Sequence, residues 1–429
     1  MLQGCGQVEV NTDAQNISDS SVIDIAADEV INLSKITDNV ISINSAGVYE
    51  ITGEATDCRI KIDLSESSTI DSDGEVTLIL NNATWSNSGD TPLQIKSANL
   101  VTLVLADGTN NRIDDERISI YDEDDDVKRK AAIFSKGDMT IVGTGSREIK
   151  EGCKDGIRVI NKDNYTGNLS IDAGDITISA PSGHGITVAE ALTINGGNIN
   201  ITESSEGLQG KYITINDGNI DIRSDDDGIN ATDPSGETEY DKKEFKKLKE
   251  REMSEPPEPM GGKPEKPEFG EMEMPKQMPM AMEEPAEDCD LTINGGTINI
   301  NASGDGVDSN ASITITGGYI TISGSTNGGN SALDYATECT MMGGSLILTG
   351  NKGMAGSLSE ESTVCMVAVT YNTVMAGTEI ALVDSNDAEI SSWVVPKDCS
   401  YIQVASSEIK IGEAYYFIIN GEKIEALIV

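Results

Sequence analysis

Apolar and polar residues alternate along most of the chain in short runs, and a glycine-containing bend interrupts each run. Six ten-residue segments share this pattern, and they begin at Leu169, Leu192, Ile213, Leu291, Ile313 and Cys339. In the second segment the alternate positions are Leu192, Ile194, Ile199 and Ile201, with Thr or Asn between them. Strict period-two alternation on both sides of a bend predicts two half-buried β-strands and argues against a helix.

A third apolar position follows each of these strand pairs, in a turn of the form Asp-Gly-Ile or a variant of it. The turns begin at Asp155, His184, Glu206, Asp227, Asp305 and Ser331. Three short strands and three turns in about 22 residues make one coil of a repeat architecture, stacked on the next coil at about 4.8 Å. The fold class that we predict is therefore all-β, a right-handed parallel β-helix with three strands per coil.

The spacing of the copies gives the domain organisation. Successive copies begin 23, 21, 78, 22 and 26 residues apart, so the step of 78 contains an insertion. We assign the β-helix to residues 22–358 and the insertion to 234–288, which holds nine of the twelve prolines and seven of the fourteen methionines. Proline at this density cannot donate to a β-ladder, and the composition predicts a disordered, looped-out segment.

The repeat stops after about residue 358. Residues 359–429 contain several alternating runs and an Asn420-Gly421 hairpin signal, which predicts antiparallel strands. An uncovered end coil would expose unpaired backbone groups and invite aggregation. We therefore predict that this tail is a small C-terminal antiparallel β cap or sandwich.

The chain is strongly acidic, with a formal net charge of −43. Nucleic-acid binding requires a Lys and Arg footprint, so a nucleic acid is excluded as partner, as is an anionic lipid surface. Such a surface collects cations, and calcium is favoured where carboxylates converge. We expect a monomer with no macromolecular partner besides a polysaccharide.

The first residues place the protein outside the cell. The run Leu2-Gln3-Gly4-Cys5 resembles the end of a bacterial lipoprotein signal, and the polar residues that follow to about residue 21 are typical of a tether. We expect a cell-surface lipoprotein that meets the membrane only through a lipid on Cys5. The seven cysteines form no Cys-x-x-Cys pair, which argues against a zinc or thioredoxin-type site and favours free, buried thiols.

The Asp-Gly turns hold the residues with an evident chemical pattern. Stacking places equivalent side chains in columns, so Asp155, Glu206, Asp227 and Asp305 share one column, while Asn230 and Asp308 share another. Like charges at this spacing repel unless a cation binds or the carboxyls hold protons. The set that we predict to ligate Ca2+ is Asp155, Glu206, Asp225, Asp227, Asn230, Asp305 and Asp308. The alternative is that Asp and Gly are simply good turn residues.

Catalytic patterns are sparse. His184 is the only histidine, and no lipase-type serine motif, zinc-protease motif or phosphate loop occurs. Lys154 and Arg158 flank Asp155 and are the candidates for the base of a polysaccharide lyase, although they are equally good ion-pair partners. Carboxylate pairs for glycoside hydrolysis are too abundant for any one pair to stand out. We therefore predict no catalytic residues, and the classes left open are a binding module, a uronate lyase and a passive surface or adhesion protein.

Four further features indicate a resemblance to a known family. With Leu192-TINGGNINI, Ser224-DDDGINA, Val101-TLVLADGTNN and the Pro- and Met-rich insertion after the GINA turn, the chain resembles a clostridial family of extracellular carbohydrate-binding β-helix proteins. The resemblance implies a pectate-lyase-like fold, bound calcium, and binding of cellulose and acidic pectic chains. The turns at His184, Glu206 and Leu333 depart from the Asp-Gly form. Crystalline glucan is usually gripped by an aromatic row, for which the candidates are Trp85 and Tyr335, with His184 as a further ligand-side residue.

Overall fold

A computed structural model describes residues 25–66, 74–117, 131–150, 155–161, 166–234 and 288–429. Within these ranges the protein is all β, apart from two single-turn 3-10 helices, η1 (Leu33–Lys35) and η2 (Leu64–Glu66). The strands form one large, mostly parallel sheet and one small antiparallel sheet near the C-terminus. The predicted all-β class and the C-terminal antiparallel sheet are confirmed. No helix in the described ranges is long and apolar enough to cross a membrane.

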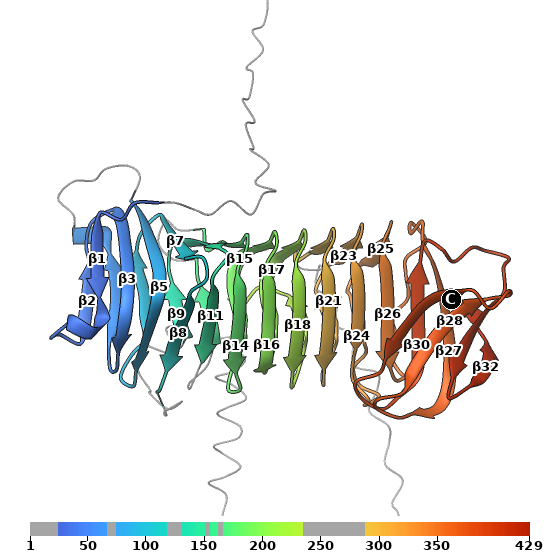
Figure 1. Cartoon of the computed structure of the whole chain (residues 1–429). Coiled ribbons are helices and arrows are strands. Elements are labelled where there is room, and N and C mark those ends of the chain that lie inside the picture. The colour runs from blue at the N-terminus through green and yellow to red at the C-terminus, as the bar shows by residue number, and fades with distance from the viewer. Residues whose placement is uncertain (1–24, 67–73, 118–130, 151–154, 162–165, 235–287) are drawn as a thin grey trace, which may run out of the picture.

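The parallel strands lie side by side in three ladders that run along the molecule (Figure 1). The first ladder consists of β1 (Glu29–Asn32), β3 (Gly47–Ala55), β5 (Glu75–Asn87), β7 (Leu100–Leu105), β10 (Asp138–Gly143), β13 (Leu169–Ile171), β15 (Ile186–Ile194), β17 (Leu208–Ile215), β20 (Leu291–Ile293), β23 (Ser312–Ile315) and β25 (Glu338–Met341).

The second ladder begins with the C-terminal residues of β3 and the C-terminal half of β5, and it continues with β8 (Asn110–Asp115), β11 (Ser146–Lys150), β14 (Asp175–Ala180), β16 (Asn198–Ser204), β18 (Asn219–Ser224), β21 (Thr297–Ala302), β24 (Tyr319–Ser323) and β26 (Ser345–Gly350). The third ladder contains β2 (Val40–Ile43), β4 (Arg59–Asp63), β6 (Leu93–Ser97), β9 (Ala131–Ser135), β12 (Asp155–Val159), the N-terminal halves of β15 and β17, β19 (Ile229–Ala231) and β22 (Val307–Ser309).

The register of the first ladder follows the predicted repeat. Leu169, Leu192, Ile213, Leu291, Ile313 and Cys339 are successive Cα partners. The step of 78 residues keeps this register, because Ile213 pairs with Leu291 while β19 pairs with β22. The chain therefore leaves after β19 in the third ladder and returns at β20 in the first. The disorder that we predict for the insertion, and the lipoprotein tether, lie outside the described residues.

One glycine in each bend between the first and second ladders has a backbone conformation that side chains rarely adopt. The φ angles are +104° at Gly174, +90° at Gly197, +122° at Gly218, +86° at Gly296, +93° at Gly318 and +81° at Gly344. L-residues with a Cβ are disfavoured in this region. The preceding residue does not have a positive φ, and it is Ala, Asp or Gly, while the second position is Gly in all six bends.

The core runs along the inside of the stack, where the inward side chains of all three ladders meet. One inward column of the second ladder is formed by Ile178, Ile201, Ile222, Ile300, Ile322 and Leu348, and all of these side chains are buried. Each buried aliphatic side chain contributes about 1.5–3 kcal/mol relative to an exposed one. Alternation therefore places an apolar side chain at most inward positions of each coil, with Asn111 and Arg147 as buried polar exceptions.

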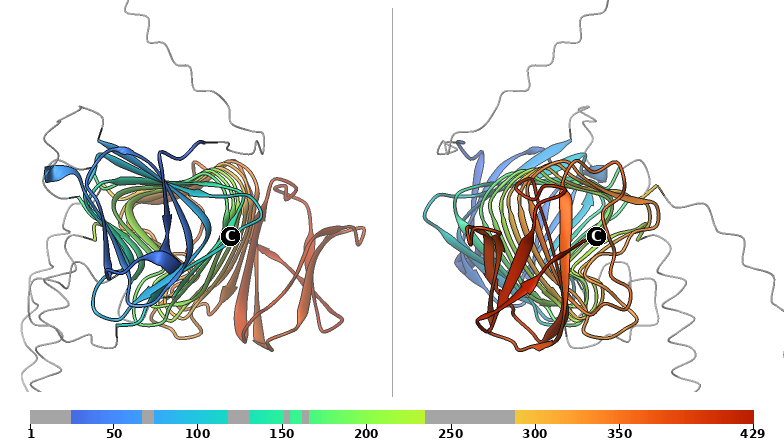
Figure 2. Two further views of the ribbon diagram at one scale, coloured as in Figure 1. Left: turned by 60° about the vertical axis from the view of Figure 1, so that its left-hand side comes forward. Right: turned by 90° about the vertical axis from the view of Figure 1, so that its right-hand side faces the viewer.

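The C-terminal residues lie at one end of the stack and to one side of it (Figure 2). β30 (Cys399–Ser406) pairs antiparallel with β26 and with β27 (Cys365–Val374), and β33 (Leu427–Ile428) pairs with β27. The small sheet consists of β29 (Glu389–Val394), β28 (Glu379–Asp384), β31 (Tyr415–Ile419) and β32 (Glu422–Glu425). The hairpin predicted at Asn420-Gly421 joins β31 to β32, and both turn residues have positive φ. This segment encloses a second apolar cluster around Phe417.

Candidate functional site

The turns that enter the third ladder bring acidic residues of successive coils together. Pairing of Gln209 with Asn230, of Asn230 with Asp308, and of Val307 with Leu333 fixes the register of these turns. The carboxyl groups that the register gathers are named here the acidic column, and they belong to Glu206, Asp226, Asp227, Asp305, Asp308 and Asp334. Asp334 occupies the position that follows Asp308, although its turn lacks the Asp-Gly sequence.

The glycine of each Asp-Gly pair allows the coils to approach closely at this turn. A Cβ on Gly228 would lie 2.3 Å from Ile300 Cγ2 and 2.5 Å from the carbonyl oxygen of Gly306. A Cβ on Gly207 would lie 2.3 Å from the carbonyl oxygen of Gly228. Both separations are shorter than a van der Waals contact, so packing of the stack requires glycine here.

The first acidic residue of the turn also has a structural role. Asp227 Oδ1 accepts a hydrogen bond from the backbone N–H of Asp305, at 2.7 Å, one coil further on. Asp305 Oδ1 accepts in the same way from Ser331, and Asp155 Oδ1 accepts from His184 at 3.1 Å. Each of these carboxylates therefore satisfies a backbone donor that begins the next strand.

At these turns in the more N-terminal coils, the carboxyl groups of Asp155 and Glu206 have partners within the protein. Arg158 Nη1 donates to Asp155 Oδ2 at 2.6 Å, and both side chains are buried. Glu206 Oε2 accepts from Gln209 Nε2 at 3.0 Å and lies 3.4 Å from His184 Nδ1. Asp155 therefore has its cation supplied by the chain, and Arg158 is held in an ion pair.

The carboxyl groups further along the column have no such partner. Within the described ranges no Lys or Arg forms an ion pair with Asp226, Asp227, Asp305 or Asp308. Burial, and then the negative charge of Asp226, raises the pKa of Asp227 to about 8. Burial, followed by repulsion from Asp334 and Asp305, raises the pKa of Asp308 to about 7. The pKa values of Asp226 and Asp305 are raised as well, in both cases chiefly by burial.

An amide oxygen beside these carboxyls also lacks a partner. Asn230 is only 9% exposed, and its Nδ2 makes a long hydrogen bond of 3.5 Å to Asp227 Oδ2. Its Oδ1 is buried and accepts no hydrogen bond. A buried oxygen without a partner costs about 1–3 kcal/mol, and a cation or a donor from a ligand would relieve this cost. Asn230 and Asp308 are Cα partners, so this oxygen lies beside the most crowded carboxyls.

The column has the donor chemistry of a hard-cation site, although carboxylates alone do not complete one. In the described part of the chain no three His, Cys, Asp or Glu side chains are grouped so as to hold a metal ion. Calcium takes six to eight oxygen ligands, which include amide and backbone oxygens and water. Asp227 and Asp308, with Asn230 Oδ1, could supply part of such a shell.

The other residues predicted from the sequence lie elsewhere. Asp225 is exposed, in contrast to the half-buried Asp227 and Asp308. Trp85 is 1% exposed inside the stack, where its Nε1 donates to the Pro92 carbonyl at 3.1 Å, so its ring is closed to a ligand. Tyr335 is half-buried, and its hydroxyl donates to Ser357 O at 2.7 Å. Lys154 lies outside the described residues.

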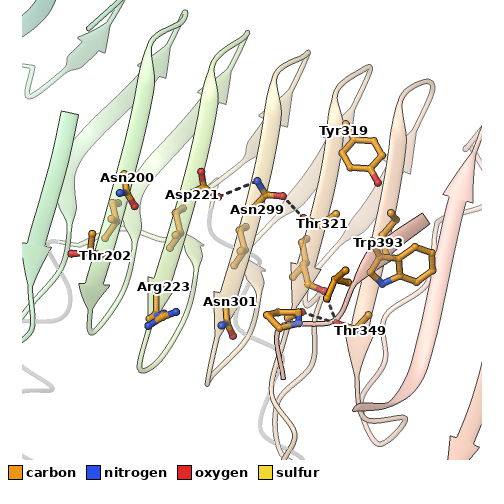
Figure 3. Close-up of a pocket in the computed structure, with 18 of the residues that line it drawn as sticks. Asn200, Thr202, Asp221, Arg223, Asn299, Asn301, Tyr319, Thr321, Thr349 and Trp393 are labelled. Atoms are coloured by element: carbon orange, nitrogen blue, oxygen red, sulfur yellow. Dashed lines mark hydrogen bonds between the residues drawn. The ribbon is translucent and has the colours of Figure 1, made fainter. Parts of the chain in front are cut away.

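The sequence does not indicate a groove that the structure forms between the second ladder and the C-terminal sheet (Figure 3). Outward side chains of β16, β18, β21, β24 and β26 form its floor, and β29 with Pro396 forms a wall. We call it the axial groove, because its floor crosses successive coils along the stack. Its volume is about 690 Å3, within the range of small-molecule sites. The aromatic residues that line it are Tyr319 and Trp393.

Two comparisons with known proteins carry the same description. The family model described as "Carbohydrate-binding domain-containing protein" matches residues 37–328. A protein of that description from Acetivibrio thermocellus is 30% identical over 156 residues, which are 36% of this chain and 50% of the relative. The chain thus spans about half the length of that curated relative. A solved structure, "polysaccharide lyase-like protein from C. thermocellum, Gadolinium derivative", covers 77% of this chain and 96% of its own, with 22% identity and a TM-score of 0.40.

Proposed function

Because the chain belongs to the family of carbohydrate-binding domain-containing proteins, we propose that it is an extracellular, calcium-dependent binder of plant cell-wall polysaccharides. We also propose that its three ladders form a right-handed parallel β-helix, since crossovers between parallel strands are right-handed almost without exception. The observation that carries the calcium part of the proposal is the acidic column. It gathers carboxyl groups with raised pKa values around Asn230 Oδ1, an oxygen with no partner.

Bound calcium would remove two costs of the folded state at once. Asp227 and Asp308 would hold the ion through their carboxylates, and Asn230 would hold it through Oδ1. Each of these groups now bears an uncompensated desolvation cost, because burial is the largest cause of both pKa shifts. The chemistry that the ion supplies is a positive charge with open coordination positions for oxygen ligands.

The charge of the chain decides how an acidic polysaccharide would bind. A protein of net charge −43 repels a uronate chain at any distance where screening is incomplete. A calcium ion held by the acidic column would attract a uronate carboxylate and bridge the two anions. Uronate binding therefore requires calcium, whereas binding of a neutral glycan does not.

Binding is favoured over lyase chemistry by the state of the candidate base. Arg158 is 6% exposed and holds Asp155 in a buried ion pair, so it is not free to approach a substrate proton. Attachment to the cell surface through Cys5 completes the proposal, with the tether in residues 1–21. A passive surface protein would share the fold and the charge but would bind no glycan.

The test is calorimetric titration of the protein with oligogalacturonate, in calcium and again in excess chelator. We expect binding in calcium only. The double variant Asp227→Asn, Asp308→Asn should lose this binding, because both carboxylate ligands are removed. The matched control is Asp217→Asn, which removes an exposed carboxylate of the same coil at the bend between the other two ladders. Uronate binding that survives in chelator would refute the bridging mechanism, and the release of unsaturated products would make the protein a lyase.

A further inference from the structure

We propose that the axial groove is a second glycan-binding site, which takes an extended, uncharged oligosaccharide without calcium. The proposal rests on the proposed function only in that the protein binds carbohydrate. It adds a location and a ligand class that differ from those of the acidic column. Four features of the groove support it, namely the rows of its floor, the aromatic wall, the charge balance and the absence of a free strand edge.

The floor of the groove presents hydrogen-bonding groups at regular intervals along the stack. Asn200, Asp221, Asn299 and Thr321 project from four successive coils (Figure 3). Asn299 Nδ2 donates to Asp221 Oδ1 at 3.0 Å, and Thr321 Oγ1 donates to Asn299 Oδ1 at 2.5 Å. These contacts hold the row in one conformation, so little side-chain entropy is lost when a ligand binds.

The direction of the row selects a straight ligand. Neighbouring coils are about 4.8 Å apart, which is close to the length of one sugar unit in an extended β-linked chain. An oligosaccharide that lies along the groove would therefore meet an equivalent side chain at each successive sugar. A curved, α-linked chain would leave the row after one or two units.

The wall supplies an aromatic surface and a donor without a partner. Tyr319 is 37% exposed at the C-terminal end of the floor, and Trp393 of β29 lies beside it (Figure 3). Trp393 Nε1 is buried in the groove wall and makes no hydrogen bond. A hydroxyl oxygen of a sugar would accept from this N–H while the sugar ring packs on the Tyr319 ring, a combination of polar and apolar contact that suits a pyranose.

The charge of the groove excludes most other occupants. Among the residues that line it, the charged side chains are Asp221 and Arg223, one of each sign. Because the groove is nearly neutral and the chain has a net charge of −43, a uronate is not attracted to the groove. A neutral sugar can bind there without electrostatic repulsion. The floor strands also offer no edge for an added peptide strand, because each of them is paired on both sides in the ladder.

The groove and the acidic column lie on different faces of the same coils. The coil that carries Asp221 in its second strand carries Asp227 in the turn that follows, and Asn299 and Asp305 are related in the same way. Groove side chains leave from the strands of the second ladder, whereas column side chains leave from the turn into the third. Occupancy of the two sites is therefore separable by mutation and by chelation.

The experiment titrates the full chain with cellohexaose, a straight neutral probe, and with maltohexaose, a curved one, in excess chelator. We expect cellohexaose to bind and maltohexaose to bind at least tenfold more weakly. Tyr319→Ala should weaken cellohexaose binding about tenfold. Trp393→Phe, which keeps an aromatic ring in the wall but removes the N–H, should weaken it about fivefold.

A matched pair of asparagines controls for the loss of a surface amide. Asn299→Ala should weaken cellohexaose binding about fivefold. Asn294→Ala should leave it unchanged, although Asn294 belongs to the same coil and makes the same kinds of contact, donating to Asn216 Oδ1 at 2.8 Å and accepting from Thr316 Oγ1 at 2.7 Å. Melting of each variant in parallel shows that the fold is retained.

The possible outcomes separate this inference from the proposed function. The inference would be overturned if cellohexaose bound only in the presence of calcium, or if the groove variants bound it as well as the wild type. The proposed function is tested separately, by the uronate titration. Uronate binding that fails, with cellohexaose binding that is lost in Asn299→Ala, would support the groove and overturn the calcium bridge. Binding of neither probe would overturn both.

Discussion

Replacing Asp227 by Asn should stabilise the protein when calcium is absent, although it changes a half-buried residue. The substitution replaces an ionisable carboxyl of the acidic column by a neutral amide and keeps the Oδ1 that accepts the Asp305 N–H at 2.7 Å. Most substitutions at buried positions destabilise a protein. The opposite sign is expected here because the charge of Asp227 is opposed by burial and by the charge of Asp226.

The magnitude follows from the pKa of Asp227, which is about 8 in the folded protein against an ordinary value of 3.8. At pH 7 the unfolded chain has released this proton and the folded protein still holds it. The cost to the folded state spans about three pH units at about 1.36 kcal/mol each, or about 4 kcal/mol. Solvent access to the partly exposed group lowers this, and we expect about 2 kcal/mol, a rise of the melting temperature on the order of 3–6 °C.

The sign of the pH dependence provides the sharper assay. A carboxyl whose folded pKa is raised makes stability fall as pH rises from about 4 to about 8, because only the unfolded chain loses the proton in that window. The melting temperatures of wild type and Asp227→Asn in chelator should therefore coincide near pH 4 and diverge up to pH 8. With calcium the order should reverse, since the wild type gains about 2.7 kcal/mol at a hundredfold excess over Kd and the variant gains little.

The control for this experiment is Asp217→Asn, which makes the same substitution at an exposed bend. It should show neither the pH-dependent gain nor the loss of the calcium response. A variant Asp227→Asn that melts below wild type in chelator at pH 7 would refute the reasoning. That result would mean that the charged carboxylate contributes more as an acceptor for the backbone N–H than it costs through repulsion.

Three further changes test the fold itself. Gly228→Ala should destabilise the protein by about 3 kcal/mol or more in thermal or denaturant melts, because its Cβ would overlap the next coil, whereas Gly328→Ala, with no atom within 4 Å of the added Cβ, should be neutral; equal effects would contradict this. Arg147→Met should raise the melting temperature, because Arg147 is 1% exposed, its guanidinium makes no hydrogen bond, and burial lowers its pKa to about 9. A lower melting temperature would mean that the contact of the guanidinium with the Trp85 ring, whose centroid is 5.9 Å away, stabilises the protein more than burial of the charge destabilises it. Asp63→Ala should lower the free energy of unfolding by about 1–3 kcal/mol at pH 7, and by progressively less as the pH falls below about 4. Burial opposes the charge of Asp63, but hydrogen bonds from Lys residues and a Ser outweigh this effect and hold the pKa of Asp63 below its usual range. A destabilisation that is constant with pH would contradict this.

The sequence predicts the repeat well because alternation and close stacking constrain the same residues. Most inward positions of the coils hold an apolar residue, and most turns with positive φ hold a glycine. A shift of one residue would turn the inward side chains out, so the spacing of Leu169, Leu192 and Ile213 determines the pairing. The local pattern alone was therefore enough to identify the ladder across the step of 78 residues.

A backbone irregularity explains why Trp85 is not available to a ligand. The alternation of Val76, Leu78 and Leu80 would place the next inward residues at even positions. The register shifts near Asn82, whose φ is +50°, so Ala83 and Trp85 face inward instead. A bulge of one residue reverses the two faces of a strand, and nothing in the alternation before it announces the change.

The axial groove could not be predicted because its two sides are distant in the chain. Tyr319 belongs to the repeat and Trp393 to the small C-terminal sheet, and each residue alone is an ordinary aromatic residue in a strand. They meet because β30 pairs antiparallel with β26, which sets the C-terminal sheet beside the second ladder. A sequence pattern records the faces of single strands, whereas this site depends on how a sheet docks.

The acidic column shows how one motif combines a structural and a chemical requirement. In the turn Asp227-Gly228-Ile229-Asn230, the glycine is needed for stacking, the isoleucine for the core, and the aspartate oxygen for the next backbone N–H. None of these three needs a metal, so the Asp-Gly sequence by itself does not indicate one. The fourth position of the turn has no structural role of this kind. In one coil it is Arg158, which forms an ion pair with Asp155, whereas in two later coils it is Asn230 or Asp308, neither of which supplies a positive charge to Asp227 or Asp305. The residue three places after the aspartate is thus the position that distinguishes a coil with an internal ion pair from the coils at which we propose that calcium binds.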